Sequence, residues 1–298
     1  MADISDINAS QSVKIIGSDL TGVEGNPVPS DDTGSLYSLL RAKDDTSTTR
    51  TVLCDEEGRL VTSALTGFGA DFSFGDVTTS ATTTTFVRRT TYTQQSTNAQ
   101  RSIASASASD TSAGTGARTV LIKYYDQTGA GPFEETVTLN GTSYVNTVAS
   151  NICYIEEMRV VTAGSGGVNA GVLTLKAATA GGGATIGTIN AGDNQTFWAH
   201  HYVATGKTAN ITGLCVSHSG TTVGSGGVFI IRSIPIGVSN AVYTQLSDFV
   251  RLYGQSSTFS RIYQSPIKID GPAILEVRVT PETSSSTVYR ASIDFFEP

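Results

Sequence analysis

The chain has 298 residues, of which 39% are hydrophobic and only 15% charged, and its formal net charge at pH 7 is −7. Its 19 Lys and Arg residues are scattered rather than gathered into a basic stripe, which argues against binding of DNA or RNA. No apolar run approaches the roughly 18 residues of a membrane-spanning helix, so no membrane partner is expected. Ser, Thr and 31 glycines weaken helices, and the composition therefore predicts a mainly-β fold.

Residues 1–65 form the first of three regions and carry a short repeat. VPSDDTGSLYS (28–38) and VLCDEEGRLVTS (52–63) both contain a Val followed by Asp, Gly and Leu at the same spacing. An Asp followed by Gly between β-forming residues is typical of a turn. We therefore predict an N-terminal arm of two small β-hairpins, which is too small to hold a large core and is expected to lean on a partner.

Residues 66–117 form the second region, which is biased toward Ser, Thr and Ala, as in TTSATTTTFVRRTT (78–91). So few apolar residues do not offset the entropy of ordering a separate core. The composition is consistent with a linker, or with an extended segment that becomes ordered only against neighbouring subunits. Phe86 and Tyr92 keep the second alternative open.

Residues 118–298 form the third region, in which short segments of alternating apolar and polar residues are separated by Gly-rich loops. This pattern predicts an antiparallel β-sandwich or jelly-roll-like domain. The expected strands lie within 118–125, 134–146, 153–161, 171–177, 208–217, 227–236, 273–280 and 287–296.

Two local signals stand out within the third region. Asn140-Gly141 is a strong hairpin signal inside 134–146. In residues 240–254, apolar side chains recur at helical spacing and Gly254 is placed to end a helix, so one helix is expected there.

The segment FWAHHYVATGKT (197–208) has the strongest appearance of a chemical site, because it holds the only Trp, two of the three His and a Gly-Lys-Thr tripeptide. A phosphate-binding loop needs Gly five residues before its Gly-Lys-Thr glycine, and His201 occupies that position. Adjacent His200 and His201 would point to opposite faces of a strand. His218 is the third histidine, and no metal-binding spacing joins the three. We therefore interpret the segment as a core strand and expect no metal site.

The remaining candidates for chemistry are also weak. Adjacent carboxylates on a strand diverge, so turn and surface roles are expected for the acidic pairs. Three distant cysteines without a CxxC motif argue against a disulfide framework or a zinc ribbon and are expected to be buried thiols. The glycine tracts do not match a dinucleotide-binding fingerprint. We expect no enzyme activity, no cofactor and no catalytic, cofactor-binding or metal residues. The groups considered are Asp31-Asp32, Glu56-Glu57, Glu134-Glu135, Glu156-Glu157, Cys54, Cys153, Cys215 and the tracts 163–171, 180–187 and 220–228.

The stretch QSVKIIGSDLTGVEGNPVPSDDTGSLYS (11–38) resembles the opening of many virion structural proteins of tailed bacteriophages. The runs 98–120, 193–208 and 247–257 are similar to phage structural proteins as well. The resemblance covers most of the chain and brings no catalytic motif with it. It implies an assembly role in the virion, as a neck, collar, tail-associated or capsid-decorating subunit.

Together these inferences predict a structural phage subunit that assembles in the bacterial host cytoplasm and functions in the virion. Its expected partners are portal or connector, capsid or tail subunits and further copies of itself, as a trimer or a hexamer. The leading position is the neck or head–tail junction, with residues 1–65 as the anchor. Capsid decoration is the first alternative. A carbohydrate-binding module is the second, although its usual exposed aromatics are poorly matched by a single Trp in an expected core strand.

Overall fold

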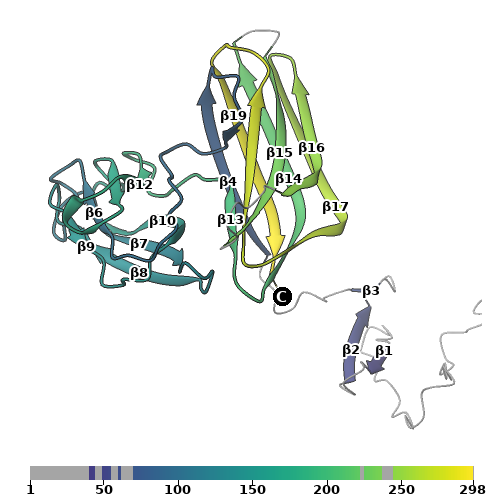
Figure 1. Cartoon of the computed structure of the whole chain (residues 1–298), viewed down its shortest axis with the longest axis horizontal. Helices are drawn as coiled ribbons and strands as arrows, with labels where there is room; N and C mark the ends of the chain where they lie inside the picture. Colours follow the sequence, from purple (N-terminus) through teal and green to yellow (C-terminus); the bar gives the residue numbers. More distant parts are fainter. Residues whose placement is uncertain are drawn as a thin grey trace, which may run out of the picture. The chain divides into compact units, whose positions relative to one another are not determined.

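The computed structural model describes residues 40–43, 49–54, 60–61, 70–221, 225–236 and 244–297. It divides the chain into two compact units, Met1–Gly67 and Phe68–Pro298. Nearly all the described regular structure is antiparallel strand, which confirms the mainly-β sandwich prediction (Figure 1). Among these residues, no helix has the length and apolar character needed to cross a membrane.

The described part of the first unit is a three-stranded antiparallel sheet in the order β1-β2-β3. Its strands are β1 (Leu40–Lys43), β2 (Thr49–Cys54) and β3 (Leu60–Val61). Cys54 of β2 pairs with Leu60 of β3, so strands flank the second predicted turn as expected. The first predicted hairpin, around Asp31–Leu36, lies outside the described residues.

Most of the second unit is a sandwich of two antiparallel sheets, here called sheets A and B. Sheet A has the order β17-β14-β19-β4, and sheet B has the order β13-β18-β15-β16 with β5 also paired to β18. The strands of sheet A are β4 (Ala70–Thr79), β14 (Thr208–Gly220), β17 (Ser256–Asp270) and β19 (Thr287–Phe296). Those of sheet B are β5 (Thr85–Phe86), β13 (His200–Val203), β15 (Gly226–Pro235), β16 (Thr244–Tyr253) and β18 (Ala273–Pro281).

The sandwich core forms because apolar residues alternate along both sheets. In β19, Tyr289, Ala291, Ile293 and Phe295 are all buried, as their spacing in the sequence predicts. They pack with side chains of sheet B, and the ring of Tyr289 lies 5.9 Å from that of Phe229. A fully buried side chain the size of Ile or Phe contributes about 1.5–3 kcal/mol, so this interior is a main source of stability.

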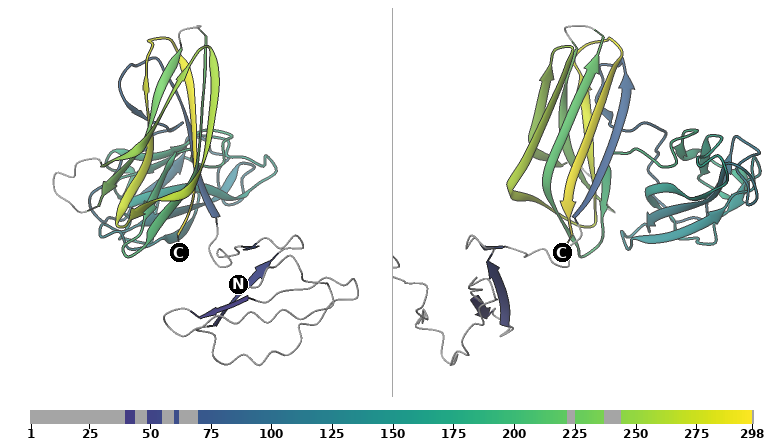
Figure 2. Two further views of the ribbon diagram at one scale, coloured as in Figure 1. Left: turned by 90° about the vertical axis from the view of Figure 1, so that its right-hand side faces the viewer. Right: turned by 180° about the vertical axis from the view of Figure 1, so that it is seen from behind.

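A smaller lobe is inserted between β5 and β13 of the sandwich (Figure 2). One of its sheets has the order β10-β7-β8, and the other has the order β12-β11-β6-β9. The strands are β6 (Ser102–Ser105), β7 (Ala117–Tyr125), β8 (Phe133–Thr138), β9 (Val145–Asn146), β10 (Tyr154–Ala163), β11 (Leu173–Lys176) and β12 (Thr185–Ile189).

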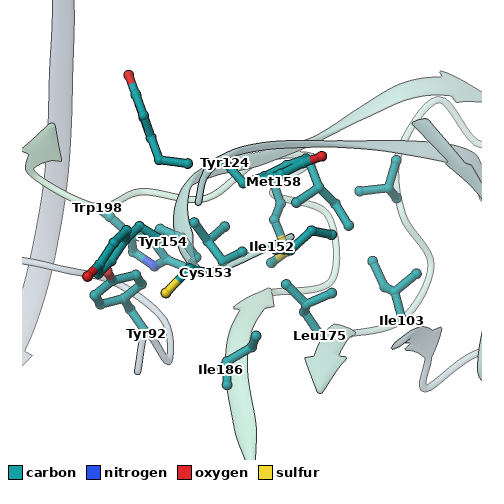
Figure 3. Packing of buried hydrophobic residues seen from close by; sticks show 14 of the residues in the cluster. Tyr92, Ile103, Tyr124, Ile152, Cys153, Tyr154, Met158, Leu175, Ile186 and Trp198 are labelled. Carbon is teal, nitrogen blue, oxygen red and sulfur yellow. The ribbon is translucent and has the colours of Figure 1, made fainter. Parts of the chain in front are cut away.

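The core of the small lobe continues onto the outer face of sheet B. Its apolar cluster joins lobe residues such as Ile152 and Met158 to Phe86, Tyr202 and Ile274 of the sandwich. Figure 3 shows part of this cluster, with Trp198 and Tyr92 beside Tyr154 and Cys153. Part of sheet B is therefore buried on both faces.

The folded part of the chain differs from the sequence prediction at its beginning. The prediction made 66–117 a linker or an extended segment and started the sandwich at 118. In the structure, β4 pairs with β19 along its whole length, β5 pairs with β18, and β6 pairs with β11. Segments poor in apolar residues take part because neighbouring strands supply the core, and no separate core is needed.

Two local predictions in the third region are wrong. Residues 244–253 of the expected helix form strand β16, which pairs with β15. Its Val250 is buried and Phe249 is 62% exposed, which is the alternation of a strand rather than the stripe of a helix. Asn140-Gly141 does turn the chain, and a single antiparallel bridge joins Asn140 to Ser143. However, β8 before the turn pairs with β7 and β9 after it pairs with β6, so these two strands do not form the predicted hairpin.

Candidate functional site

The two adjacent histidines lie on β13, where all four residues are buried, which confirms the predicted core strand. Their side chains diverge as expected. The ring of His200 faces the small-lobe core, 4.7 Å from the ring centre of Tyr92 and 5.1 Å from that of Tyr202. The ring of His201 faces the other way and stacks on Phe295 at 4.0 Å.

His201 lies between two carboxylates that come from distant parts of the chain. Its Nδ1 is 2.8 Å from Oε1 of Glu156, and its Nε2 is 2.8 Å from Oε1 of Glu297. Both ring nitrogens donate only when the imidazole is charged. Burial alone would lower the pKa of His201, but the two carboxylates outweigh burial and raise this pKa to about 9. We call this group the His201 triad.

Glu156 connects the small lobe to the sandwich, because it lies on β10 and reaches β13. Its second oxygen accepts a hydrogen bond from the backbone N–H of Tyr202 at 2.8 Å. Burial would raise the pKa of Glu156, but charged His201 holds it below its ordinary value. The predicted surface role is therefore wrong for Glu156, whose side chain is only 9% exposed because β10 packs against β13.

The His201 triad is a cluster of charged groups whose ring nitrogens are both used in hydrogen bonds. A protonated imidazole with both nitrogens donating has no lone pair for a metal ion or for a substrate proton. His200 donates through Nε2 to the backbone oxygen of Glu156, and burial lowers its pKa. His218 has separate partners, the backbone oxygen of Gly254 and the hydroxyl of Ser257. No group of three His, Cys, Asp or Glu side chains in the described ranges is arranged to hold a metal ion.

The Gly-Lys-Thr tripeptide is a turn between β13 and β14. The N–H of Lys207 donates to the backbone oxygen of Ala204 at 3.1 Å, and Gly206 adopts a φ of +76°. Strand β14 starts at Thr208, whereas a phosphate-binding loop would lead into a helix. The tripeptide therefore lies in a turn between two strands and not in a phosphate-binding loop, in agreement with the sequence, which has His201 where such a loop needs Gly.

The described acidic pairs diverge, as expected for neighbours on a strand. Glu157 pairs with Arg159 at 3.4 Å, whereas its neighbour Glu156 contacts His201. Glu135 accepts hydrogen bonds from the N–H groups of Val148 and Ala149. The pairs Asp31-Asp32 and Glu56-Glu57 lie outside the described residues.

The prediction that the cysteines are buried thiols holds for only one of the two whose side chains are described. Cys153 is fully buried, and burial raises its pKa to about 11, so its thiol stays protonated at neutral pH. Cys215 is a free thiol that is half-buried rather than buried. The side chain of Cys54 lies outside the described residues.

Asp110 is a buried carboxylate that the sequence prediction missed. It accepts hydrogen bonds from the backbone N–H groups of Ala117, Ala170 and Gly171 and from the hydroxyl of Ser105. These donors explain part of the glycine tract 163–171, whose backbone approaches the 105–117 segment closely. No local motif identifies Asp110, because its partners are up to 61 residues away.

A small hollow of about 140 Å³ adjoins the triad. Asp71, Lys123, Glu156 and Glu157 contribute its charged groups. Burial raises the pKa of Glu157. No hydroxyl or thiol in the hollow is hydrogen-bonded to a base, so the arrangement does not provide an activated nucleophile.

Comparisons with known protein families and with curated proteins find no match to this chain. Among solved structures, the Gx strain of infectious bursal disease virus matches at 10% identity over 77% of this chain and 80% of that chain, with a TM-score of 0.14. The VP2 subviral particle of the same virus matches at 10% identity over the same shares, with a TM-score of 0.13. Similarity at this level supports no inference about fold or function.

Proposed function

We propose that the chain is a non-enzymatic structural subunit of a tailed-phage particle, attached near the neck or head–tail junction through residues 1–65. The observation that supports this proposal is the division of the chain into a small first unit and a larger second unit. The second unit has two apolar clusters of its own, whereas the described strands of the first unit are only two to six residues long. Short strands of this kind have open edges and gain stability by pairing with another chain.

The chemistry of the buried charged groups supports a role in assembly. His201 and Asp110 form their hydrogen bonds with other segments of the same chain and so stabilise the fold. Edge strand β16 exposes Phe249 and Tyr253, at 62% and 57%, and the guanidinium of Arg251 lies over the ring of Tyr253. Aromatic residues and Arg are enriched where proteins meet, so this edge suits contact between copies in a symmetric oligomer.

Antibody labelling of intact particles tests the proposal. An antiserum raised against the purified chain is expected to label particles at the neck, as seen by electron microscopy with gold-tagged antibody. Label spread over the capsid would favour the decoration alternative. Absence of the chain from purified particles, measured by mass spectrometry, would contradict both positions.

A further inference from the structure

A shallow groove crosses the outer face of sheet A. Its floor has two cross-strand rows, since Arg290 of β19 pairs with Asp76 of β4 and with Ser217 of β14, and the next row places Phe74 beside Ser292. These side chains face outward, because their neighbours in β19 are buried in the core. We call this hollow, of about 340 Å³, the Arg290 groove.

The wall of the groove is formed by two backbone segments next to β4. The N–H of Arg89 donates to the oxygen of Phe197, and the N–H of Ala199 donates to the oxygen of Val87. Gly75 of β4 permits this approach, since a Cβ there would lie only 2.5 Å from the oxygen of Val87. The wall therefore holds Arg89 and Phe197 over the edge of the sheet.

Aromatic rings line this side of the groove. Phe197 meets Phe74 edge-on at 5.2 Å, and Phe74 stacks on Phe72 at 5.6 Å. The guanidinium of Arg89 lies 4.0 Å from the ring centre of Phe197. Phe72 is 61% exposed, so the aromatic series continues into solvent. Exposed rings of this kind offer flat apolar faces to a ligand.

The two arginines of the groove differ in their partners. Arg89 is fixed by Asp76 at 2.8 Å and by Asp193 at 2.9 Å. Arg290 is exposed and has no hydrogen bond or ion pair to any described residue. One free guanidinium thus lies beside the hydroxyls of Ser217 and Ser292, on a chain whose net charge is −7. A guanidinium takes a carboxylate in a two-pronged hydrogen bond, which gives it geometric specificity.

The geometry points to an acidic saccharide as the ligand of the Arg290 groove. Small-molecule sites combine apolar rings with a few placed polar groups in volumes of about 300–1,000 Å³, and this groove is at the small end of that range. The apolar face of a sugar ring packs on Phe74 and Phe197, its carboxylate binds Arg290, and its hydroxyls meet the two serines. A ligand with one carboxylate also suits an acidic chain, which would repel a polyanion. This binding does not depend on the proposed position in the particle.

An array of immobilised oligosaccharides tests the inference with the full chain. The probes end in glucuronic, galacturonic or sialic acid, and each has a neutral counterpart that lacks the carboxylate. We expect binding to at least one acidic probe above its counterpart. Arg290→Ala should weaken that binding about tenfold or more, because a charge-assisted hydrogen bond is lost, and Arg290→Lys should restore part of it.

Arg261→Ala provides a control, since Arg261 is an exposed arginine on β17 of the same sheet and does not line the groove. It should leave binding unchanged, and all variants should melt at the temperature of the unmodified chain. The inference is overturned if no acidic probe binds more tightly than its neutral counterpart, or if Arg290→Ala and the control Arg261→Ala lose binding equally. Capture of another particle protein through Arg290, with no saccharide bound, would make the groove a protein contact and overturn it as well.

Discussion

At the scale of single residues, the His201 triad ties three distant segments together. His201 belongs to β13 of the sandwich, Glu156 belongs to β10 of the small lobe, and Glu297 follows β19. Removing one partner leaves a buried charge without its counter-charge, which costs free energy, so the loss of one member destabilises the other two. The triad should therefore make stability depend on pH.

We predict that the free energy of unfolding falls between pH 6.5 and pH 9. The pKa of His201 is raised from 6.5 to about 9, so its stabilisation is complete below about pH 6.5 and is lost as the pH passes 9. The shift corresponds to about 3 kcal/mol. The pKa of Glu156 is lowered, so its contribution is complete above about pH 4.5 and is lost in acid. Urea unfolding at pH 6 and at pH 9.5 measures the difference.

Glu297→Gln should make this pH dependence shallower, because one of the two carboxylates that raise the pKa of His201 is gone. Glu134→Gln is the control, as Glu134 is exposed on β8 and does not belong to the triad. Equal pH profiles for all three proteins would contradict a charged His201 in the folded chain.

A second residue-scale prediction concerns Asp110. Asp110→Asn replaces one carboxylate oxygen by an amide that faces N–H donors, so buried donors lose their acceptor. We expect a loss of roughly 3 kcal/mol in unfolding free energy, measured by urea denaturation. Asp294→Asn, on the exposed face of β19, should change it by less than about 0.5 kcal/mol. Equal effects would contradict the role of Asp110.

At the scale of elements, β16 can be tested by two neighbouring substitutions. In a strand, Phe249 faces solvent while Val250 enters the sandwich core, where it is 6% exposed. Val250→Ser should cost about 2 kcal/mol or more, because it removes buried apolar surface and buries a hydroxyl. Phe249→Ser should cost less than about 0.5 kcal/mol. Thermal melts of both variants would contradict the strand if the two losses were similar.

The alternation of apolar and polar residues predicted the last strands, because apolar residues occupy the positions that face the sandwich core and mostly polar residues occupy the positions between them. Leu275, Val277 and Val279 are buried in β18 as the pattern requires. The pattern failed in 240–254, where the exposed rings of Phe249 and Tyr253 lie three or four positions from other apolar residues and imitate a helical stripe. An exposed aromatic edge and a buried helical face look alike until the neighbouring strand is known.

The candidate site was predictable only in part. The divergence of His200 and His201 follows from strand geometry alone, and the structure confirms it. The partnership of His201 with Glu156 and Glu297 does not follow, because it spans 45 and 96 residues and depends on how the small lobe packs. Long-range pairs of this kind leave no mark in the local pattern.

At the scale of the whole molecule, the second unit should fold without the first. The side chains of its two apolar clusters, including the partly buried ones packed against them, lie between Val77 and Phe295. A fragment of residues 68–298 is therefore expected to melt cooperatively, near the temperature of the full chain. A fragment of residues 118–298 should melt earlier or aggregate, because it lacks β4, β5 and β6 and exposes the edges of β19 and β18.

Calorimetry of both fragments measures the difference. Similar melting of the two would restore the boundary at 118 that composition alone suggested. Composition failed here because the Ser- and Thr-rich segment 66–117 gives β4 and β5 to the sandwich and β6 to the small lobe, and so completes sheets whose apolar residues come mostly from elsewhere in the chain.

The pairing of β4 with β19 also determines when the sandwich can be completed. Thr79 of β4 bonds in register with Thr287 of β19, and the strands run antiparallel from there to Ala70 and Phe296. At about 5–20 residues per second, a ribosome takes roughly 10–40 seconds to make the chain that separates them. Throughout that time the nascent β4 has no strand to pair with, whereas the inserted lobe has all its strands as soon as Ile189 has been made. Translation therefore favours a fixed order, in which the small lobe folds first and sheet A closes last.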